Sequence, residues 1–290
     1  MNHTLAASLI LYHPDVNVVE NIESYIHLVK KLFIVDNSEE CDENIIQSIK
    51  IKFPNYTIEF IINHQNEGLS VPLNQVFSRS EQQEFDFVIT MDQDSKFINP
   101  SVLNEAMTIL QNDETIGLIG MAHYKTGMKT WYQGNRNFIF AKDVITSGSI
   151  TRISAWKKIG GFDERFFIDE VDNDFCMALK VNGYKILQSK CKVIQHQLGE
   201  SVLMPHRFSE KTKEVALHNP LRSYYITRNN LLFLKKYSLH NPWYVFRKLK
   251  YYFLRIKKHY LYAPDFNEHK RFIKKGVKDF FKKKFGKLEN

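Results

Sequence analysis

The first 122 residues alternate between short apolar segments and segments whose apolar residues recur at helical spacing. The short segments predict β-strands at 6–11, 31–35, 56–62, 85–91 and 117–122. The segments between them predict helices at 16–28, 44–52, 70–80 and 101–111. Strands and helices that alternate at this spacing predict an α/β fold with a mostly parallel, doubly wound sheet.

The pattern becomes less regular after Met121. We expect a strand at 144–153, interrupted by Ser147-Gly148-Ser149, and helices at 154–159 and 171–182. Two late strands are expected at 184–187 and 192–196. From residue 217 onward the chain is expected to be helical and aromatic, with breaks at Pro242 and Pro264. A change of charge near Lys235 predicts a body at 1–234 and a helical extension at 235–290.

The charge of the chain is divided unevenly between these two parts. Residues 235–290 hold 14 Lys and 3 Arg against 4 acids, a net charge of +13, which leaves −5 of the total +8 for the preceding residues. A mildly acidic body joined to a basic, aromatic extension indicates a polyanionic partner for the extension, either membrane phosphates or nucleic acid.

Cysteine usage and hydropathy bear on the compartment. Cys41, Cys176 and Cys191 form no CxxC pair, so the sequence favours a reducing compartment over a disulfide framework or a zinc knuckle. The N-terminal residues show no basic leader or cleavage pattern, and no apolar segment reaches the roughly 18 to 20 residues of a membrane-spanning helix. We therefore expect a cytoplasmic protein, with peripheral attachment to the inner face of the cell membrane through the extension as a further hypothesis.

Two acidic features follow predicted strands, at the edge of the sheet where ligands bind in open α/β folds. Asp36 ends the second strand and could accept hydrogen bonds from a base or a ribose; a turn residue that bonds its own backbone is the alternative interpretation. Asp92-Gln93-Asp94 follows a strongly apolar strand. Two carboxylates on alternate residues favour a site for Mg²⁺ or Mn²⁺ and a diphosphate over a solvated acidic turn.

A third acidic feature places four acids in six positions at the start of a predicted helix: Asp169, Glu170, Asp172 and Asp174. Acids near a helix N-terminus are stabilised by its dipole, so part of this cluster could serve only as capping. Four acids exceed what capping needs, and Phe166 and Phe167 precede them. A carboxylate near aromatic side chains is a reasonable general base, so we expect at least one catalytic acid here.

In this order, the three features resemble glycosyltransferase family 2, and within it the rhamnosyltransferase-type enzymes of bacterial polysaccharide assembly. The resemblance covers roughly residues 5–234. Its elements include the Asn66-Glu67-Gly68 helix start, the Asp-x-Asp motif, the Gly160-Gly161-Phe162 turn and the Gln195–Gly199 segment. The stretch Pro220–Tyr225 with Arg228-Asn229 resembles the family's aromatic Arg-Asn helix. One departure is Ala178, at a position where the family usually carries Arg.

The resemblance implies a GT-A fold, inversion at the anomeric carbon and a nucleoside diphosphate sugar as donor. It implies a nucleotide-sugar half at about 1–122 and an acceptor half at about 123–234. The roles that it implies are these: a catalytic base at Asp172; donor contacts at Asp36, Asn66, Gly68, Asp92, Asp94, Arg222 and Arg228; acceptor-side positions at Trp156, Asp169, Glu170 and Asp174; and metal ligands at Asp94, Asp92 and His196. For His196 a structural role is equally open, and Arg222 and Arg228 could instead pair with the acidic cluster.

The cofactor expected from the resemblance is Mg²⁺ or Mn²⁺. The expected donor is dTDP-rhamnose, with UDP-hexoses and UDP-galactofuranose left open, and the expected acceptor is a saccharide or polyprenyl-linked saccharide of cell-surface polysaccharide such as O-antigen or capsule. An anionic membrane surface is the partner expected for the extension, not nucleic acid, and the aromatic C-terminal helices could form a homodimer face. The alternatives are a nucleotide-sugar-forming nucleotidyltransferase and a non-enzymatic polyanion-binding protein. A nucleotidyltransferase needs a Gly-rich phosphate loop after the first strand, and this sequence has none there. A polyanion-binding protein does not need clustered acids, which would repel phosphates. No P-loop motif is present either, which disfavours a P-loop kinase.

Overall fold

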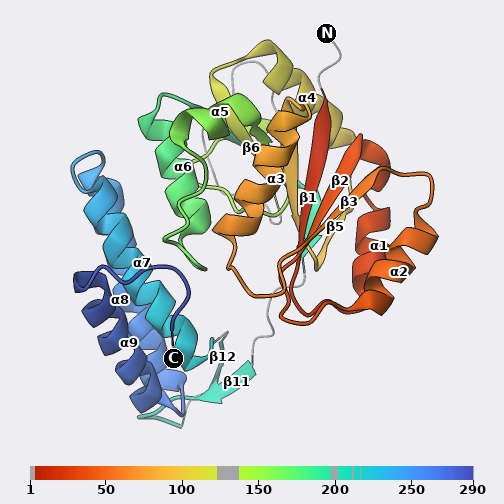
Figure 1. The fold of residues 1–290 in the computed structure, drawn as a ribbon. Helices are drawn as coiled ribbons and strands as arrows, with labels where there is room; N and C mark the ends of the chain where they lie inside the picture. Colours follow the sequence, from red (N-terminus) through yellow and green to blue (C-terminus); the bar gives the residue numbers. More distant parts are fainter. Residues whose placement is uncertain (1–3, 123–136, 197–201, 211, 216, 290) are drawn as a thin grey trace. The chain divides into compact units, whose positions relative to one another are not determined.

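The computed structural model describes residues 4–122, 137–196, 202–210, 212–215 and 217–289. The chain divides into two compact units, of which the first comprises Met1–Glu164 and Val171–Gln197. The second comprises Leu198–Asn290 together with the short segment Arg165–Glu170 (Figure 1). The boundary expected at Lys235 falls inside helix α7 (Pro220–Tyr237) of the second unit, and the division of the body into a donor half and an acceptor half remains a prediction.

An eight-stranded sheet runs through the first unit, in the order β3-β2-β1-β4-β8-β6-β9-β7. Its strands are β1 (Leu5–Leu11), β2 (Lys31–Asp36), β3 (Ile58–Ile62), β4 (Phe87–Asp92), β6 (Ile116–Ala122), β7 (Phe138–Phe140), β8 (Ser149–Arg152) and β9 (Lys185–Lys192). β8 runs antiparallel to β4 and β6, and β7 runs antiparallel to β9, whereas all other neighbours in the sheet are parallel. The sheet is therefore mostly parallel, as the alternation of segments predicted.

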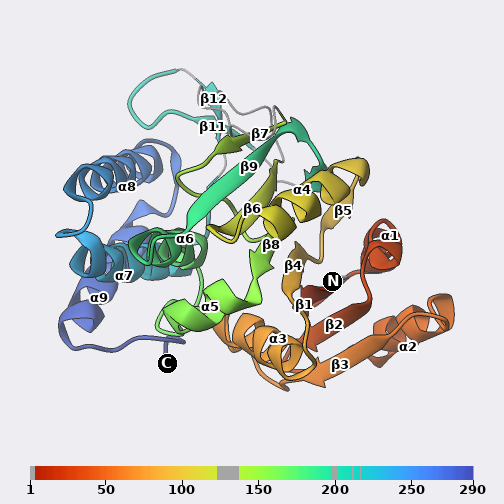
Figure 2. The same cartoon turned by 90° about the horizontal axis from the view of Figure 1, so that it is seen from above.

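Helices cover both faces of this sheet (Figures 1 and 2). On one face lie α1 (Asn17–Glu23), α2 (Glu43–Lys52) and α4 (Ser101–Asn112), whose apolar residues share one buried cluster with alternate residues of the strands. On the other face lie α3 (Ser70–Gln82) and α5 (Ile153–Ile159), where the ring of Phe77 packs against Trp156 and Phe162. Because successive strand residues point to opposite faces, strands this apolar must be covered on both sides.

Several elements differ from the expected boundaries. The helix expected at 16–28 ends at Glu23 and resumes as a short 3-10 turn, Ile26–Leu28. The strand expected at 144–153 begins only at Ser149, because Gly148 adopts a left-handed φ of +73° and Ile153 already starts α5. The two late strands become β9 and the short β10 (Ile194–His196), which pairs antiparallel with β5 (Ser95–Phe97).

Three helices dominate the second unit: α7, α8 (Pro242–Tyr262) and α9 (Phe266–Phe281). A hairpin of β11 (Val202–Pro205) and β12 (Thr212–Val215) completes it. The breaks expected at Pro242 and Pro264 are confirmed, and Pro242 occupies the first turn of α8 after the capping residue Asn241. Among the described residues, no helix combines the length and the apolar character needed to cross a bilayer.

Candidate active site

Two acidic strand ends flank the end of β1. Asp36, the last residue of β2, pairs with Leu11, and Asp92, the last residue of β4, pairs with Ile10. Because neighbouring strands lie about 4.8 Å apart, the two acidic residues lie on the order of 10 Å apart across β1. The structure thus brings Asp36 and Asp92 to the carboxyl edge of the parallel strands, where open α/β sheets bind ligands.

The carboxylate of Asp36 is almost fully buried, with 1% of the residue exposed. Its Oδ1 accepts a hydrogen bond of 2.8 Å from the backbone N–H of Ser38, whereas its Oδ2 is buried with no hydrogen-bond partner among the described residues. Burial, and after it the neighbouring Asp36 carboxylate, raise the pKa of the Cys41 thiol to about 12. The turn interpretation explains only one oxygen of Asp36, and the other is an acceptor that a bound ligand could satisfy.

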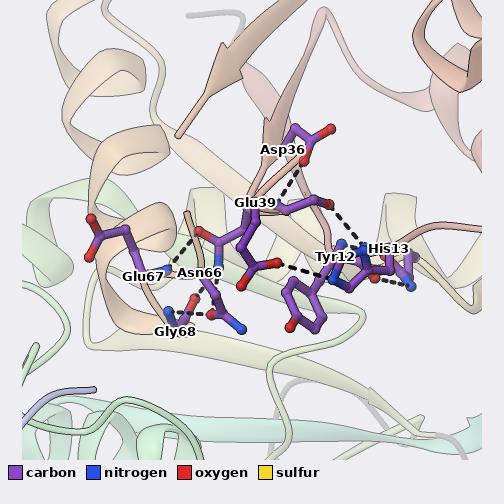
Figure 3. Close-up of polar contacts among 10 residues, drawn as sticks. Tyr12, His13, Asp36, Glu39, Asn66, Glu67 and Gly68 are labelled. Atoms are coloured by element: carbon purple, nitrogen blue, oxygen red, sulfur yellow. Dashed lines mark hydrogen bonds and ion pairs between the residues drawn. The ribbon is translucent and has the colours of Figure 1, made fainter. Parts of the chain in front are cut away.

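A tight turn at Asn66–Gly68 lies beside Asp36 (Figure 3). The side chain of Asn37 holds both sides of this turn, because its Oδ1 accepts from the N–H of Glu67 at 3.1 Å and its Nδ2 donates to the carbonyl of Gly68 at 2.8 Å. The Oδ1 of Asn66 accepts from the N–H of Gly68 at 2.9 Å. Gly68 has a φ of +76°, which side-chain-bearing residues rarely adopt.

An open hollow of about 670 Å³ lies next to the ends of β1 and β2. His13 spans it, since its N–H donates to Ser38 Oγ at 3.0 Å and its Nε2 lies 3.1 Å from a carboxylate oxygen of Glu39 (Figure 3). The hollow is lined by His13, Pro14, Ser38, Glu39, Glu40, Cys41, Asp42, Glu43 and Asn44. Its four acids disfavour phosphate and leave a neutral base or a sugar hydroxyl as the better match.

The middle residue of Asp92-Gln93-Asp94 fixes the position of this motif. The amide of Gln93 accepts from the N–H of Tyr12 at 2.8 Å and donates to the Tyr12 carbonyl at 3.2 Å. The carbonyl of Gln93 accepts from Asn21 of α1 at 2.9 Å. Asp92 and Asp94, both half-buried, are thus the two residues on either side of an anchored glutamine.

Asp172 lies in the first turn of α6 (Val171–Val181) and is half-buried. Its Oδ1 accepts from the backbone N–H of Thr146 at 3.2 Å and also from the hydroxyl of Thr146. Asp172 helps to line a small hollow together with Phe162, Phe175 and Cys176. The carboxylate is therefore held in one orientation by two donors from a different segment of the chain.

The segment that holds Asp172 also holds the strand end that carries Asp92. The carbonyl of Thr146 accepts from the hydroxyl of Thr90 in β4 at 2.5 Å. The next residue, Ser147, accepts from the N–H of Asp92 at 3.2 Å and donates to Ser95 at 2.7 Å. Two consecutive residues, Thr146 and Ser147, therefore connect the Asp-x-Asp motif with Asp172, although the two acids lie 80 positions apart in the sequence.

Asp169 and Glu170 pair with cations of the second unit. Both have a left-handed backbone, with φ of +61° and +67°, which costs energy for residues other than glycine. Arg222 binds Asp169 with two nitrogens, at 3.0 and 3.1 Å, and Lys248 forms an ion pair with Glu170. Pairing of Arg222 with the acidic cluster was the alternative to a donor contact, and it is the arrangement observed.

Arg228 is wholly buried in the second unit, with 0% exposed. Its guanidinium donates to the carbonyl of Gly286 at 2.8 Å and to that of Arg165 at 3.4 Å. A donor contact at Arg228 therefore finds no support, because backbone carbonyls already occupy this side chain. The expected Arg-Asn helix thus serves the interior of the second unit, where Asn229 also donates to the carbonyls of Ile168 and Asp169.

Two acceptor-side candidates are used inside the first unit. Trp156 donates from Nε1 to Asn74 Oδ1 at 3.1 Å and packs on Phe77. Asn74 also accepts from the N–H of Phe162 at 2.8 Å, so it fixes the turn at Gly161. Asp174 is buried, with 3% exposed. These contacts give Trp156 a packing role and do not by themselves assign it to an acceptor.

Among the described residues, no group of three or more His, Cys, Asp or Glu side chains is arranged to hold a metal ion. The backbone of His196 in β10 pairs with Ser95 in β5, directly after Asp94. This register brings His196 into the neighbourhood of the Asp-x-Asp motif, while its role as a ligand stays a prediction. Within the part of the chain that the structure describes, the Asp-x-Asp motif offers two carboxylates on alternate residues and no complete coordination sphere.

The site contains positioning residues that the sequence did not single out. These residues are Asn37, Gln93, Thr146 and Ser147. Asn37 and Gln93 adjoin acids that the sequence did identify, whereas Ser147 begins the Ser147–Ser149 interruption and Thr146 directly precedes it. The signal in the sequence that could have identified them is a polar residue directly beside a motif. Which partner it binds depends on the pairing of distant segments, so spacing alone could not reveal it.

Fold and site together define a class of protein: an α/β enzyme with acidic residues at the carboxyl edge of its sheet and a half-buried, hydrogen-bonded carboxylate, Asp172, on the helix after β8 and α5. The glycosyl transferase family 2 model matches residues 16–186, and the chain belongs to this family. It is 23% identical over 262 residues to a protein named dTDP-rhamnosyl transferase RfbF from Shigella flexneri, with 81% of each chain covered.

Solved glycosyltransferases share the fold. S. aureus TarS 1–349 in complex with UDP-GlcNAc superposes with a TM-score of 0.57 at 16% identity, covering 96% of this chain and 81% of that one. The mannosyltransferase PcManGT from Pyrobaculum calidifontis, in complex with GDP-Man and Mn²⁺, gives a TM-score of 0.55 at 10% identity, covering 97% and 83%. The chain spans 40% of the length of a longer S. aureus TarS structure. These likenesses establish a GT-A fold, as the family resemblance implied.

Proposed function

We propose that this chain is an inverting glycosyltransferase that transfers a sugar from a nucleoside diphosphate sugar to a hydroxyl of a saccharide or lipid-linked saccharide. L-Rhamnose from dTDP-rhamnose is the donor favoured by the relative from Shigella flexneri. The observation that carries the proposal is the Thr146-Ser147 pair, which contacts both the strand end at Asp92 and the carboxylate of Asp172. A leaving-group site and a candidate base are thereby held by one segment.

The nucleoside is assigned to the ends of β1 and β2. The unpartnered Oδ2 of Asp36 is a natural acceptor for the N–H of a thymine or uracil ring. The Asn66–Gly68 turn begins the segment leading to α3, and Asn37, the residue after Asp36, holds it in place. The acids that line the hollow keep phosphates away from it, so the diphosphate is expected nearer Asp92 and Asp94.

The residues present fit a bound Mg²⁺ or Mn²⁺. These ions are commonly held by one or two carboxylates together with phosphate oxygens of the substrate, so a protein site with only Asp92 and Asp94 is a sufficient donor set. PcManGT was solved in complex with GDP-Man and Mn²⁺, which supports a divalent ion here as well. When bound, the ion would stabilise negative charge on the diphosphate leaving group.

Asp172 is the proposed general base. It accepts the proton of the acceptor hydroxyl while the acceptor oxygen forms its bond to the anomeric carbon, and the bond from that carbon to the diphosphate oxygen breaks with its electron pair. One displacement of this kind inverts the anomeric centre and needs no covalent enzyme intermediate. Thr146 keeps the carboxylate oriented, because both of its donors bind Oδ1.

A donor panel tests the proposal. The purified chain is incubated with dTDP-rhamnose, UDP-galactofuranose, UDP-glucose, UDP-GlcNAc and GDP-mannose, and release of nucleoside diphosphate is measured with and without a saccharide acceptor. We expect release to be greatest with dTDP-rhamnose. Thermal unfolding with dTDP, UDP or GDP in Mn²⁺ provides a second measure, because a ligand that binds only the folded state raises the melting temperature. If no nucleotide raised the melting temperature and no donor released its nucleoside diphosphate, the proposal would be excluded.

Metal dependence has its own test. Chelation with EDTA should abolish transfer, and titration with Mn²⁺ or Mg²⁺ should restore it. Asp94→Ala should lower transfer about 100-fold or more, on the order of the effect of losing an electrostatic contact to the leaving group. Glu20→Gln, an exposed acid on α1, is the matched control and should behave as the wild type. Full activity in EDTA would contradict a metal role for Asp92 and Asp94.

A further inference from the structure

Helix α8 of the second unit has two distinct faces. On the inner face Tyr244 and His259 are buried, with 5% and 3% exposed, and the hydroxyl of Tyr252 lies 3.0 Å from that of Thr227 in α7. On the outer face Trp243 and Phe246 are exposed at 73% and 61%. From Trp243 to Lys257 the outer face is therefore exposed, while the inner face packs against neighbouring helices.

The exposed residues of the outer face form a continuous stripe. Trp243, Phe246, Lys250, Phe253 and Lys257 follow one another at steps of three and four residues and are all exposed. Tyr260, one step further on, is 42% exposed and packs against Phe208 and Phe266. Residues at such steps lie on one side of an α-helix. Trp243 and Phe246 stack with ring centroids 6.1 Å apart, and Phe253 is 58% exposed. We call this set the α8 stripe. Exposed aromatic residues aligned in this way are unusual unless another surface covers them.

Charge identifies the kind of surface. Helix α8 contains six basic residues and no acid: Arg247, Lys248, Lys250, Arg255, Lys257 and Lys258. Lys248 is engaged by Glu170, whereas Lys250 and Lys257 lie within the α8 stripe itself. Two copies of a helix that carries six basic residues and no acid would repel each other, so charge opposes a symmetric dimer through this face.

Helix α9 and the residues after it add a second cationic feature in the same unit. A hollow of about 400 Å³ is lined by Lys274, Lys275, Lys278, Asp279, Lys282 and Lys284. Its one acid, Asp279, already accepts from the hydroxyl of Tyr224 at 3.0 Å and lies 3.6 Å from Lys275. Five lysines around one hollow suit phosphate oxygens, which supports an anionic partner for this unit.

We propose that the α8 stripe docks this chain onto an anionic phospholipid surface. Trp243, Phe246 and Phe253 enter the headgroup region, where amphipathic aromatic rings are favoured. Lys250 and Lys257 extend from the same face to lipid phosphates, with their aliphatic stems along the apolar boundary. A helix with aromatic residues and cations on one exposed face lies in the plane of the interface. This docking is independent of the proposed transfer reaction.

Vesicle sedimentation tests the docking. The full chain is mixed with vesicles of phosphatidylcholine alone or with phosphatidylglycerol, at low and high salt. Wild-type protein should sediment with the anionic vesicles and at least tenfold more weakly with the neutral ones. The charge variant, Lys250→Glu with Lys257→Glu, should bind anionic vesicles at least 25-fold more weakly, because each basic residue near the surface strengthens binding about fivefold. High salt should weaken the wild type in the same direction.

An apolar variant and two matched controls complete the design. Trp243→Ser with Phe253→Ser should lose binding to anionic vesicles while keeping its circular dichroism spectrum. Lys30→Glu with Lys185→Glu, and Val16→Ser with Ile51→Ser, change exposed residues of the first unit by the same chemistry and should bind as the wild type. Failure of the wild type to bind anionic vesicles would overturn the proposal. So would a wild-type dimer in solution that the apolar variant converts to a monomer, because the stripe would then face a second copy.

Discussion

At Asp172, a single carboxylate oxygen accepts both donors of Thr146, the backbone N–H and the hydroxyl. The carbonyl of Thr146 is in turn bound by Thr90 at the end of β4, and the neighbouring Ser147 binds the N–H of Asp92. Each of these bonds joins segments that lie far apart in the sequence. Together they fix the separation between the proposed base and the proposed leaving-group site, which a displacement reaction requires to be constant.

Asp172→Asn tests the base directly. The amide keeps the size of the side chain but cannot take a proton, so kcat should fall by about 10² to 10⁴, the range that general acid–base catalysis contributes. Donor affinity, measured by calorimetry with dTDP and Mn²⁺, should change less than twofold. Turnover near the wild-type rate would assign the base to another residue and leave the family membership untouched.

Thr146→Ala tests the positioning of that base. Removal of the hydroxyl leaves Oδ1 with one donor from this residue, and a hydrogen bond to a charged group is worth about 1.5–3 kcal/mol, so kcat should fall about 10- to 100-fold. KM for the donor should stay within about twofold, because Thr146 is not placed at the nucleotide. Thr146→Ser restores the hydroxyl and should recover most of kcat. If Thr146 had only a structural role, both variants would have a lower melting temperature, and kcat and KM would change together.

At the scale of elements, α7 and α9 approach each other closely enough to require a glycine. A Cβ at Gly276 would lie 2.7 Å from the carbonyl oxygen of Tyr224 and 3.2 Å from Cβ of Thr227. The same contact region buries Arg228, whose guanidinium lies 5.1 Å from the ring centroid of Tyr224 and 5.2 Å from that of Tyr225. Backbone atoms cannot move aside as a flexible side chain would, so this interface is sensitive to one added methyl group.

Gly276→Ala should therefore destabilise the protein, although alanine is the better helix former by about 1 kcal/mol. Overpacking against backbone costs about 1–3 kcal/mol, so the loss should exceed the gain in helix propensity. Chemical denaturation of the full chain measures the difference. Lys274→Ala, an exposed position on the same helix, is the control and should change the free energy of unfolding by less than about 0.5 kcal/mol. Equal or greater stability of Gly276→Ala would show that the helices can separate freely.

At the scale of the whole molecule, stability is linked to pH through three clustered histidines of the second unit. The rings of His218 and His259 lie 4.4 Å apart, and those of His259 and His269 lie 4.5 Å apart. Burial, then the neighbouring His269, Lys258 and Arg255, lower the pKa of His259 to about 4, against the opposing effect of Asp265. Burial and nearby cations likewise lower the pKa of His218 to about 3. Both histidines are therefore neutral in the folded protein at neutral pH.

This linkage predicts loss of stability in mild acid. Above the unfolded pKa of about 6.5 the histidines are neutral in both states and cost nothing; below it the unfolded chain binds protons that the folded chain excludes. For His259 the free energy of unfolding should be about 2 kcal/mol lower at pH 5 than at pH 7.5, on the basis of 1.36 kcal/mol per pKa unit. His259→Phe should remove this part of the pH dependence in urea unfolding. If the free energy of unfolding of His259→Phe fell between pH 7.5 and 5 as steeply as that of the wild type, His259 would be protonated in the folded state as readily as in the unfolded chain.

By itself, the sequence determined the alternation of strands and helices, the parallel sheet and the placement of Asp36 and Asp92 at strand ends. These features depend on local apolar periodicity and on the rule that parallel strands present their carboxyl ends at one edge. The breaks at Pro242 and Pro264 were predictable for the same reason, since proline restricts its own backbone wherever it occurs.

Only the tertiary structure decided which polar residues meet. Arg222 and Arg228 have equivalent sequence signals, yet one binds Asp169 at the surface and the other is buried against the carbonyls of Gly286 and Arg165. Thr146 reaches Asp172 because β8 inserts antiparallel between β4 and β6, a pairing that no local pattern encodes. Long-range pairing depends on the packing of the entire sheet, and hydrogen bonds follow from that packing and not from spacing along the chain.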